Sequence, residues 1–291
     1  GLLEAYPSAR VVLFCDARKD ALAVEAALLK EQIGANRMAL LTGARRVHER
    51  SEAAKQIERL GFTGPRDKRD DEPAVLIATS AGEVGVDFDA DHAVMDLVPW
   101  ERMVQRLGRV NRRGEHGSST VIVLDRGVST PDWARHGADP EAVRTLLGYL
   151  TEDAGTAPCG PHALRSVAGE HPQQVVAASS KAPLHPPLER ATLDAWSLTS
   201  LREHTGRPEI APWLRGWVEE DRPQCAVIWR KYLPPEGTPE PEIEQLFRAA
   251  SPHLSEKLEA DAWQVADWLA ERSKAIGMAD AKTKKTGEDA L

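Results

Sequence analysis

The sequence predicts an α/β fold over residues 1–127, a parallel sheet with helices on both faces, followed by a mixed, mainly helical accessory region over residues 128–291. Two observations support this prediction. Short apolar runs alternate with amphipathic stretches up to about residue 125. After residue 126 proline and glycine become frequent, as in TAPCGPHA and SKAPLHPPLE. This change in composition places a domain boundary near residue 127.

Five runs are expected to form strands, because each is apolar on both faces and bounded by polar or small residues. They lie at residues 10–16, 38–43, 74–80, 92–98 and 119–125. Helical periodicity predicts helices between them at residues 17–34, 47–61 and 101–113. In the second region we expect helices at 140–152 and 255–276 and a strand at 224–233. Ligands of parallel sheets bind beyond the carboxyl ends of the strands, so that edge is where we seek a site.

The composition is that of an ordinary folded protein, with 42% hydrophobic and 28% charged residues. No apolar run is long enough to span a membrane and no leader opens the chain, so a cytoplasmic protein without membrane contact is expected. Cys15, Cys159 and Cys225 are too dispersed to predict a disulfide framework or a zinc site. The net charge of -8 argues against binding nucleic acid by net charge, so basic residues are interpreted locally.

One short stretch concentrates positive charge: QRLGRVNRRG, residues 105–114, holds four arginines in ten residues. On a helix, Gln105, Arg109 and Arg112 would project from the face opposite an apolar anchor. The planar, permanently charged fork of arginine pairs bidentately with phosphate oxygens. The alternative interpretation is a solvated helix face.

A second motif lies upstream, where TSAGEVGVDFD (79–89) follows a predicted strand with a small, glycine-containing turn. Backbone amides in such a turn can approach a phosphate closely. Asp87 then offers a carboxylate that can accept hydrogen bonds from ribose hydroxyls. With the arginine stretch, two elements suited to phosphate lie at the ends of neighbouring strands, which predicts a nucleotide site.

These motifs resemble a known family. VLIATSAGEVGVDFD and QRLGRVNRRG resemble motifs V and VI of superfamily 2 helicases, and VVLFCDARKDA with LTGARRVHER resembles the motif IV region and the segment after it. The resemblance covers about residues 8–125 and implies the second RecA-like domain of such an enzyme. GRVNR, preceded by DLVPWERMVQRL, further resembles the CRISPR-associated helicase-nuclease of type I systems. LDAWSLTS and APWLRGW point to subtype I-G, formerly I-U.

The resemblance implies roles for several residues. Arg109 and Arg112 would be arginine fingers that reach the γ-phosphate of ATP held on a partner domain. Gln105 would contact the nucleotide or its attacking water, and Gly85 and Asp87 would help to bind the nucleotide. All five are therefore expected to face one cleft.

The resemblance also implies a path for nucleic acid. Thr79 would bind the backbone of single-stranded DNA through its hydroxyl and amide, with Gly43 and Arg18 as further candidates from the loops after earlier strands. Thr79 could instead be a helix cap or turn residue, and Arg18 could form a surface salt bridge.

Several expected parts of such an enzyme are missing from the sequence. It contains no G-x-x-x-x-G-K-[ST], so we expect a first RecA-like domain in cis to hold most of the ATP and Mg²⁺. DDEP (70–73) lacks the apolar strand that precedes a magnesium-binding acidic box and is expected to be a solvated loop. No histidine precedes an aspartate, so no metal centre is predicted here. An HD nuclease domain and the CRISPR surveillance complex are the further partners that the resemblance implies.

The sequence thus predicts the second motor domain of an ATP-dependent helicase that translocates on single-stranded DNA and serves foreign-DNA degradation, an antiviral defence. The chain alone is not expected to hydrolyse ATP. Two alternatives remain: half of an RNA helicase, since backbone contacts discriminate poorly between DNA and RNA, or a non-catalytic RecA-like docking module.

Overall fold

A computed structural model describes residues 2–43, 45–65, 70–127, 133, 136–150, 159–182, 184–200, 207–216, 223–230, 234–235 and 237–275. The chain divides into two compact units. The first comprises residues 1–180 and 226–258, and the second comprises residues 181–225 and 259–291. The predicted boundary near residue 127 adjoins residues 128–132, which lie outside the described part of the chain, and it stays a prediction.

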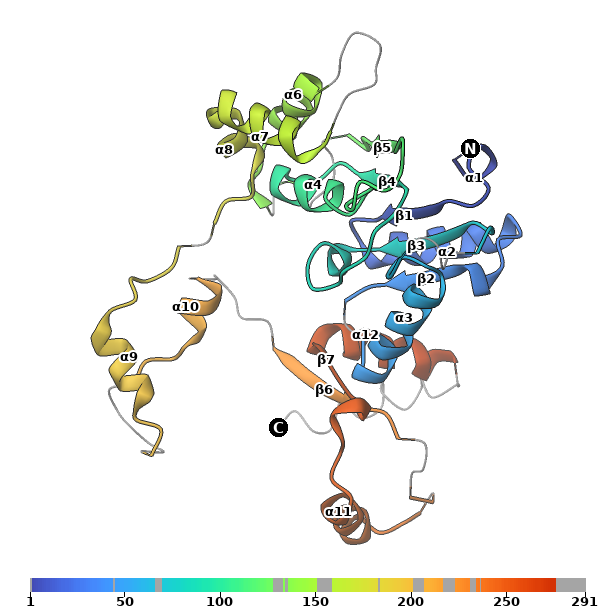
Figure 1. The fold of residues 1–291 in the computed structure, drawn as a ribbon. Coiled ribbons are helices and arrows are strands. Elements are labelled where there is room, and N and C mark those ends of the chain that lie inside the picture. The colour runs from blue at the N-terminus through green and yellow to red at the C-terminus, as the bar shows by residue number, and fades with distance from the viewer. Residues whose placement is uncertain are drawn as a thin grey trace. The chain divides into compact units, whose positions relative to one another are not determined.

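The first unit is built on a five-stranded sheet whose paired strands are all parallel (Figure 1). The strands are β1 (Arg10–Phe14), β2 (Met38–Leu41), β3 (Ala74–Ala78), β4 (His92–Asp96) and β5 (Val121–Leu124). Their order across the sheet is β2-β3-β1-β4-β5, so β1 lies at the centre. All five predicted strands are confirmed, each with slightly narrower limits. Strands of four or five residues suffice, and in β1, β3 and β4 nearly every residue is buried, whereas Ile122 and Leu124 of the edge strand β5 are exposed.

Helices cover the two faces of the sheet, as predicted. On one face, α2 (Arg18–Lys30) packs with alternate residues of β1 and β3, among them Leu13 and Val75. On the other face, the core combines Val12 with side chains near the end of α3 (Val47–Arg59) and on α4 (Trp100–Leu107).

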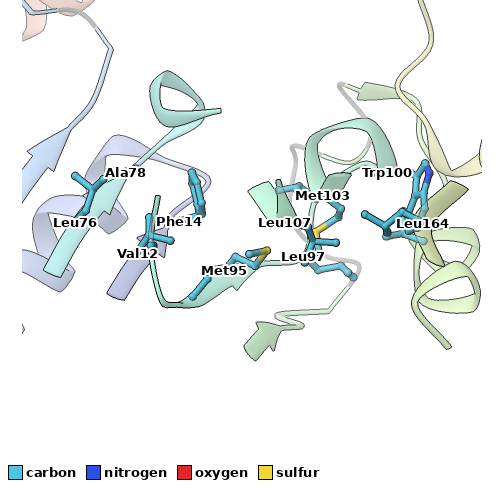
Figure 2. Close-up of a cluster of buried hydrophobic side chains, with 14 of the residues drawn as sticks. Val12, Phe14, Leu76, Ala78, Met95, Leu97, Trp100, Met103, Leu107 and Leu164 are labelled. Atoms are coloured by element: carbon cyan, nitrogen blue, oxygen red, sulfur yellow. The ribbon is translucent and has the colours of Figure 1, made fainter. Parts of the chain in front are cut away.

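The larger core extends beyond the sheet. Figure 2 shows Phe14 and Met95 of the sheet with Met103 and Leu107 of α4 in one cluster of buried side chains, which also includes Leu164. Leu164 belongs to α7, one of the three helices described between residues 140 and 178. These are α6 (Pro140–Leu150), α7 (Pro161–Glu170) and α8 (Pro172–Ala178). The apolar core therefore continues past residue 127.

Arg10, at the amino end of β1, ties the loop at 70–73 to the sheet. This loop was predicted to be solvated, and Asp70, Asp71 and Glu72 are exposed. Asp70 also accepts from Arg10 at 2.8 Å and from Arg37 at 2.7 Å. Arg10 is 0% exposed, and its guanidinium also donates to the carbonyl of Leu60. A buried guanidinium needs a paired anion, so this loop is held by an arginine that the sequence places inside a strand.

The remaining described elements are mostly short helices, as predicted for the second region. They are α1 (Leu2–Ala5), α9 (Arg190–Ser197), α10 (Ala211–Arg215), α11 (Glu240–Ala249) and α12 (Ala262–Ala275), with 3₁₀ turns at Ala35–Arg37, Ser80–Gly82 and Leu254–Glu256. The helix expected at 255–276 begins only at Ala262, because Lys257–Asp261 forms β7 and pairs with β6 (Gln224–Ile228). None of the helices described is long and apolar enough to cross a membrane.

Candidate functional site

Backbone hydrogen bonds tie the arginine stretch to the loop that follows β3. The amide of Ala90 donates to the carbonyl of Arg109 at 2.9 Å, and the amide of Asn111 donates to the carbonyl of Ala90 at 2.8 Å. Ala90 and Val110 thereby form a parallel β-bridge. The two motifs singled out in the sequence are thus held side by side by main-chain contacts, independent of their side chains.

The expected helix over 101–113 is wrong in its second half, since α4 ends at Leu107. Gly108, a poor helix former, occupies the C-cap, and Asn111 has a φ of 47°, in the left-handed region that asparagine tolerates. Arg109 and Arg112 therefore do not share a helical face with Gln105. They project instead from the turns on either side of the β-bridge residue Val110.

Arg109 nevertheless turns toward the predicted nucleotide loop. Its Nη2 donates to the carbonyl of Glu83 at 2.7 Å, and its guanidinium lies 5.7 Å from the ring centroid of Phe88. Burial and then the like charge of Arg112 lower the pKa of Arg109 from its ordinary value. A guanidinium does not lose its proton in proteins, so the group is a cation bonded to a neutral acceptor.

Arg112 reaches the same loop from the other side of Val110. Its Nη1 lies 2.6 Å from Oδ1 of Asp87, and its amide donates to Oδ1 of the buried Asp89 at 2.8 Å. The side chains of Arg112 and Asp87 are 49% and 80% exposed, so this ion pair is solvated and weak. A phosphate group could compete with Asp87 for the guanidinium.

The other predicted nucleotide contacts are placed as follows. Gly85 is exposed with a φ of +86°, a backbone conformation that favours glycine, so the loop turns between Glu83 and Asp87. Gln105 is exposed on the last turn of α4. The structure thus brings Arg109, Arg112 and Asp87 to one loop, while Gln105 lies on the neighbouring helix.

A buried ionic cluster behind this loop was missed from the sequence. Glu83, 5% exposed, accepts from Arg106 Nε at 2.8 Å and from Arg102 at 3.0 Å on each carboxylate oxygen. Asp16, after β1, lies 2.8 Å from Arg102 and 3.8 Å from Arg106. Arg106 is 0% exposed, and burial lowers its pKa from the ordinary value. A signal existed, because Arg106 follows the buried Met103 by three residues and so falls near the apolar face of α4.

The candidate nucleic-acid contacts lie at the carboxyl ends of three neighbouring strands. Arg18 begins α2 after β1, Gly43 follows β2, and Thr79 follows β3. Thr79 is buried, and its amide donates to the carbonyl of Leu41 at 3.0 Å, so that amide is engaged within the sheet. Arg18 and Gly43 are exposed, and an added Cβ at Gly43 would meet nothing within 4 Å.

A cavity of about 50 Å³ also opens at this edge, lined in part by Asp16, Asp96, Asp125 and Arg126. It does not include either candidate finger arginine. The described residues contain no group of three or more histidine, cysteine or carboxylate side chains that could hold a metal ion.

Comparisons with known proteins match the part of the chain that holds these motifs. Residues 8–115 match the protein family described as CRISPR-associated nuclease/helicase Cas3, C-terminal. No curated protein matches the chain.

Two solved structures with a TM-score of 0.50 or more agree with this chain in fold. A CRISPR-associated protein is 18% identical with a TM-score of 0.53, over 91% of this chain and 33% of its own length. T. fusca Cas3 is 18% identical with a TM-score of 0.50, over 68% of this chain and 23% of its own. T. fusca Cas3 with ATP is 19% identical with a TM-score of 0.48, over 68% and 22%. The chain thus spans between 22% and 33% of the length of these proteins.

The predicted fold class is therefore confirmed, and the five parallel strands have a RecA-like order. Residues 8–115 are similar to the C-terminal region of the Cas3 nuclease/helicases.

Proposed function

We propose that this chain contributes the second motor domain of an ATP-dependent helicase that translocates on single-stranded DNA. One observation carries the proposal: Arg109 and Arg112, from the turns on either side of Val110, both contact the loop that holds Gly85 and Asp87. A solvated helix face would not direct two guanidinium groups at one loop.

The two arginines are suited to act on a phosphate held by another domain. Arg109 donates to a neutral carbonyl and keeps its full charge, and the pair between Arg112 and Asp87 is solvated. Arg112 can therefore turn to a stronger anion at little cost, and Arg109 can offer its other N–H donors to that anion while Nη2 stays on the carbonyl of Glu83. In phosphoryl transfer an arginine finger neutralises charge in the transition state and contributes about 10³ to 10⁵ in rate.

The neighbouring residues would bind and orient the nucleotide. The exposed carboxylate of Asp87 would accept hydrogen bonds from ribose hydroxyls once Arg112 has moved to the phosphate. Gly85 lets the backbone turn there, and Gln105 would reach the nucleotide or its attacking water from the end of α4. We assign the phosphate cradle and the Mg²⁺ to a first RecA-like domain in cis.

Single-stranded DNA would cross the carboxyl edge of β1, β2 and β3. Thr79 would contribute its hydroxyl there, since its amide is used by Leu41. Arg18 and Gly43 are exposed at the same edge, where a charge and an uncovered backbone suit a phosphate chain.

The family similarity of residues 8–115 supports a proposal for the biological setting. We assign the chain to foreign-DNA degradation in cytoplasmic type I CRISPR interference, with an HD nuclease domain and the surveillance complex as partners. LDAWSLTS and APWLRGW support subtype I-G.

The test is strand unwinding and ATP turnover by the parent protein that carries the first RecA-like domain, on tailed DNA and RNA duplexes. We expect unwinding of DNA by the wild type and loss of turnover by orders of magnitude in the Arg109→Ala/Arg112→Ala variant. Arg113→Ala is the matched control, because Arg113 donates to the carbonyl of Gly64 and contacts neither Glu83 nor Asp87 in the described contacts. It should remain near wild-type activity.

Two outcomes would favour the alternatives. Unwinding of RNA alone would indicate an RNA helicase, and a wild-type parent without ATP turnover would indicate a docking module. Residues 1–291 alone should hydrolyse ATP no faster than a buffer control.

A further inference from the structure

Glu83 contacts three arginines with two different parts of the residue. Its carboxylate accepts from Arg106 at 2.8 Å and from Arg102 at 3.0 Å. Its main-chain carbonyl accepts from Nη2 of Arg109 at 2.7 Å. Glu83 therefore connects the loop to α4 through its side chain and also accepts a hydrogen bond from Arg109, a candidate arginine finger.

The backbone of this loop is placed by close packing. Glu83 directly follows the 3₁₀ turn Ser80–Gly82, and its amide donates to the carbonyl of Ser80 at 3.0 Å, while the amide of Gly82 donates to the carbonyl of Thr79 at 2.8 Å. A Cβ added at Gly82 would lie 2.8 Å from Cβ of Ala78 and 3.2 Å from the ring of Phe14. Only glycine permits this approach, so Glu83 leaves the turn at a fixed position above the sheet.

The carboxylate cannot easily leave that position. Arg106 is 0% exposed, and its other anion, Asp16, is 3.8 Å away. A buried charge is tolerated only when it is paired, so rotation of Glu83 would strand the guanidinium of Arg106. Arg102 closes the cluster from the outside with bonds to both Glu83 and Asp16. The ionic cluster therefore fixes the side chain of Glu83, and with it the carbonyl that receives Arg109.

We infer that Glu83 is a positioning residue for ATP hydrolysis, which sets Arg109 through its own carbonyl while its carboxylate anchors the loop to Arg102 and Arg106. The inference rests on the proposed finger role of Arg109. A displacement of about 1 Å of a group in such a site can cost on the order of 100-fold in rate. Loosening the anchor should therefore lower kcat and leave the affinity for ATP nearly unchanged.

The experiment compares three substitutions in the parent protein with saturating single-stranded DNA. Glu83→Gln keeps the shape but removes the charge of the anchor. Asp16→Asn removes a charge from the same cluster, and Asp16 has no contact with Arg109 among the described residues, so it is the matched control. Arg109→Ala, alone and with Glu83→Gln, shows whether the effect passes through Arg109. Each variant is assayed for kcat, KM and thermal unfolding.

We expect Glu83→Gln to lower kcat by roughly 10- to 100-fold, with KM within a few-fold of wild type. Asp16→Asn should lower kcat much less at a comparable change in Tm, and Glu83→Gln should have no added effect beside Arg109→Ala. If Glu83→Gln does not fold, Glu83→Asp keeps the charge but withdraws it by one methylene, and it should lower kcat several-fold.

Equal losses of kcat and Tm in Glu83→Gln and Asp16→Asn would overturn the inference, because Glu83 would then act on stability alone. A wild-type kcat in Glu83→Gln would also overturn the inference. If that variant does not fold, a wild-type kcat in Glu83→Asp would do so. If Arg109→Ala itself keeps wild-type turnover, the finger role of Arg109 is wrong. If Arg109→Ala is inactive but Glu83→Gln keeps wild-type kcat, only the positioning role of Glu83 is wrong.

Discussion

Replacing Arg106 with methionine isolates the contribution of the buried charge. The guanidinium of Arg106 is 0% exposed, bonds to Glu83 at 2.8 Å and to the carbonyl of Asp96 at 3.1 Å, and lies 5.2 Å from the ring centroid of Phe14. Methionine is also long and unbranched, so it retains most of the packing while it removes the charge and its hydrogen bonds. The measured loss is therefore mainly electrostatic.

The size of the stability loss depends on which charged partners remain after Arg106 is replaced. Removing one partner of a buried ion pair costs about 3–5 kcal/mol when the other charge is left uncompensated. Here Glu83 keeps Arg102, bonded at 3.0 Å to each carboxylate oxygen. We therefore expect the lower end, about 3 kcal/mol in the free energy of unfolding. For a domain of this size that corresponds to a fall in Tm of about 6–12 °C.

Urea and thermal unfolding of the purified protein measure this loss. Arg248→Met is the matched control, because Arg248 bonds to Glu244 at 2.7 Å on the surface of α11 with its side chain 78% exposed. An exposed ion pair contributes little, so the control should unfold nearly as the wild type does. If Arg106→Met costs no more stability than Arg248→Met, the reasoning from the buried cluster is refuted.

Two further predictions concern the supports of the sheet. Gly82→Ala places a Cβ 2.8 Å from that of Ala78 and should cost about 1–3 kcal/mol by overpacking; an unchanged Tm would contradict the close approach. Bonds from Arg37, aided by its charge and that of Arg10, hold the pKa of Asp70 at about 2 against its ordinary 3.8. Because the folded pKa is the lower one, this stabilisation is present above about pH 4 and is lost as the pH falls toward 2. The difference in urea midpoint between wild type and Asp70→Asn should shrink over that range, and a constant difference would argue against the pair.

The sheet could be predicted from the sequence because its signal is local. Each strand is a short apolar run, and coverage on both faces makes that run continuous rather than alternating. The end of α4 was harder to predict from the sequence. Met103, Leu107 and Val110 continue a helical period, but Gly108 and Asn111 stop the helix after Leu107. Here the backbone preferences of two residues outweigh a periodic pattern.

The sequence predicted the residues of the candidate site but not the contacts that hold them in place. The structure brings Arg109 and Arg112 to the loop that holds Asp87, even though the expected helical face does not exist. The β-bridge at Val110 holds the two segments together. A bridge between segments twenty residues apart leaves no periodic signal in either one. The anchor of Glu83 was missed for a similar reason, since it depends on Asp16 and Arg106, which only the fold brings together.

The central claim is that an arginine of this chain completes an ATPase site on another domain, and the most direct measurement is ATP turnover by Arg112→Ala. Arg112 is half exposed and its pair with Asp87 is weak, so its loss should leave the fold and Tm unchanged. In the parent protein at saturating ATP and single-stranded DNA, we predict a fall in kcat of about 10³-fold or more. Near-normal turnover by a folded Arg112→Ala variant would contradict the account.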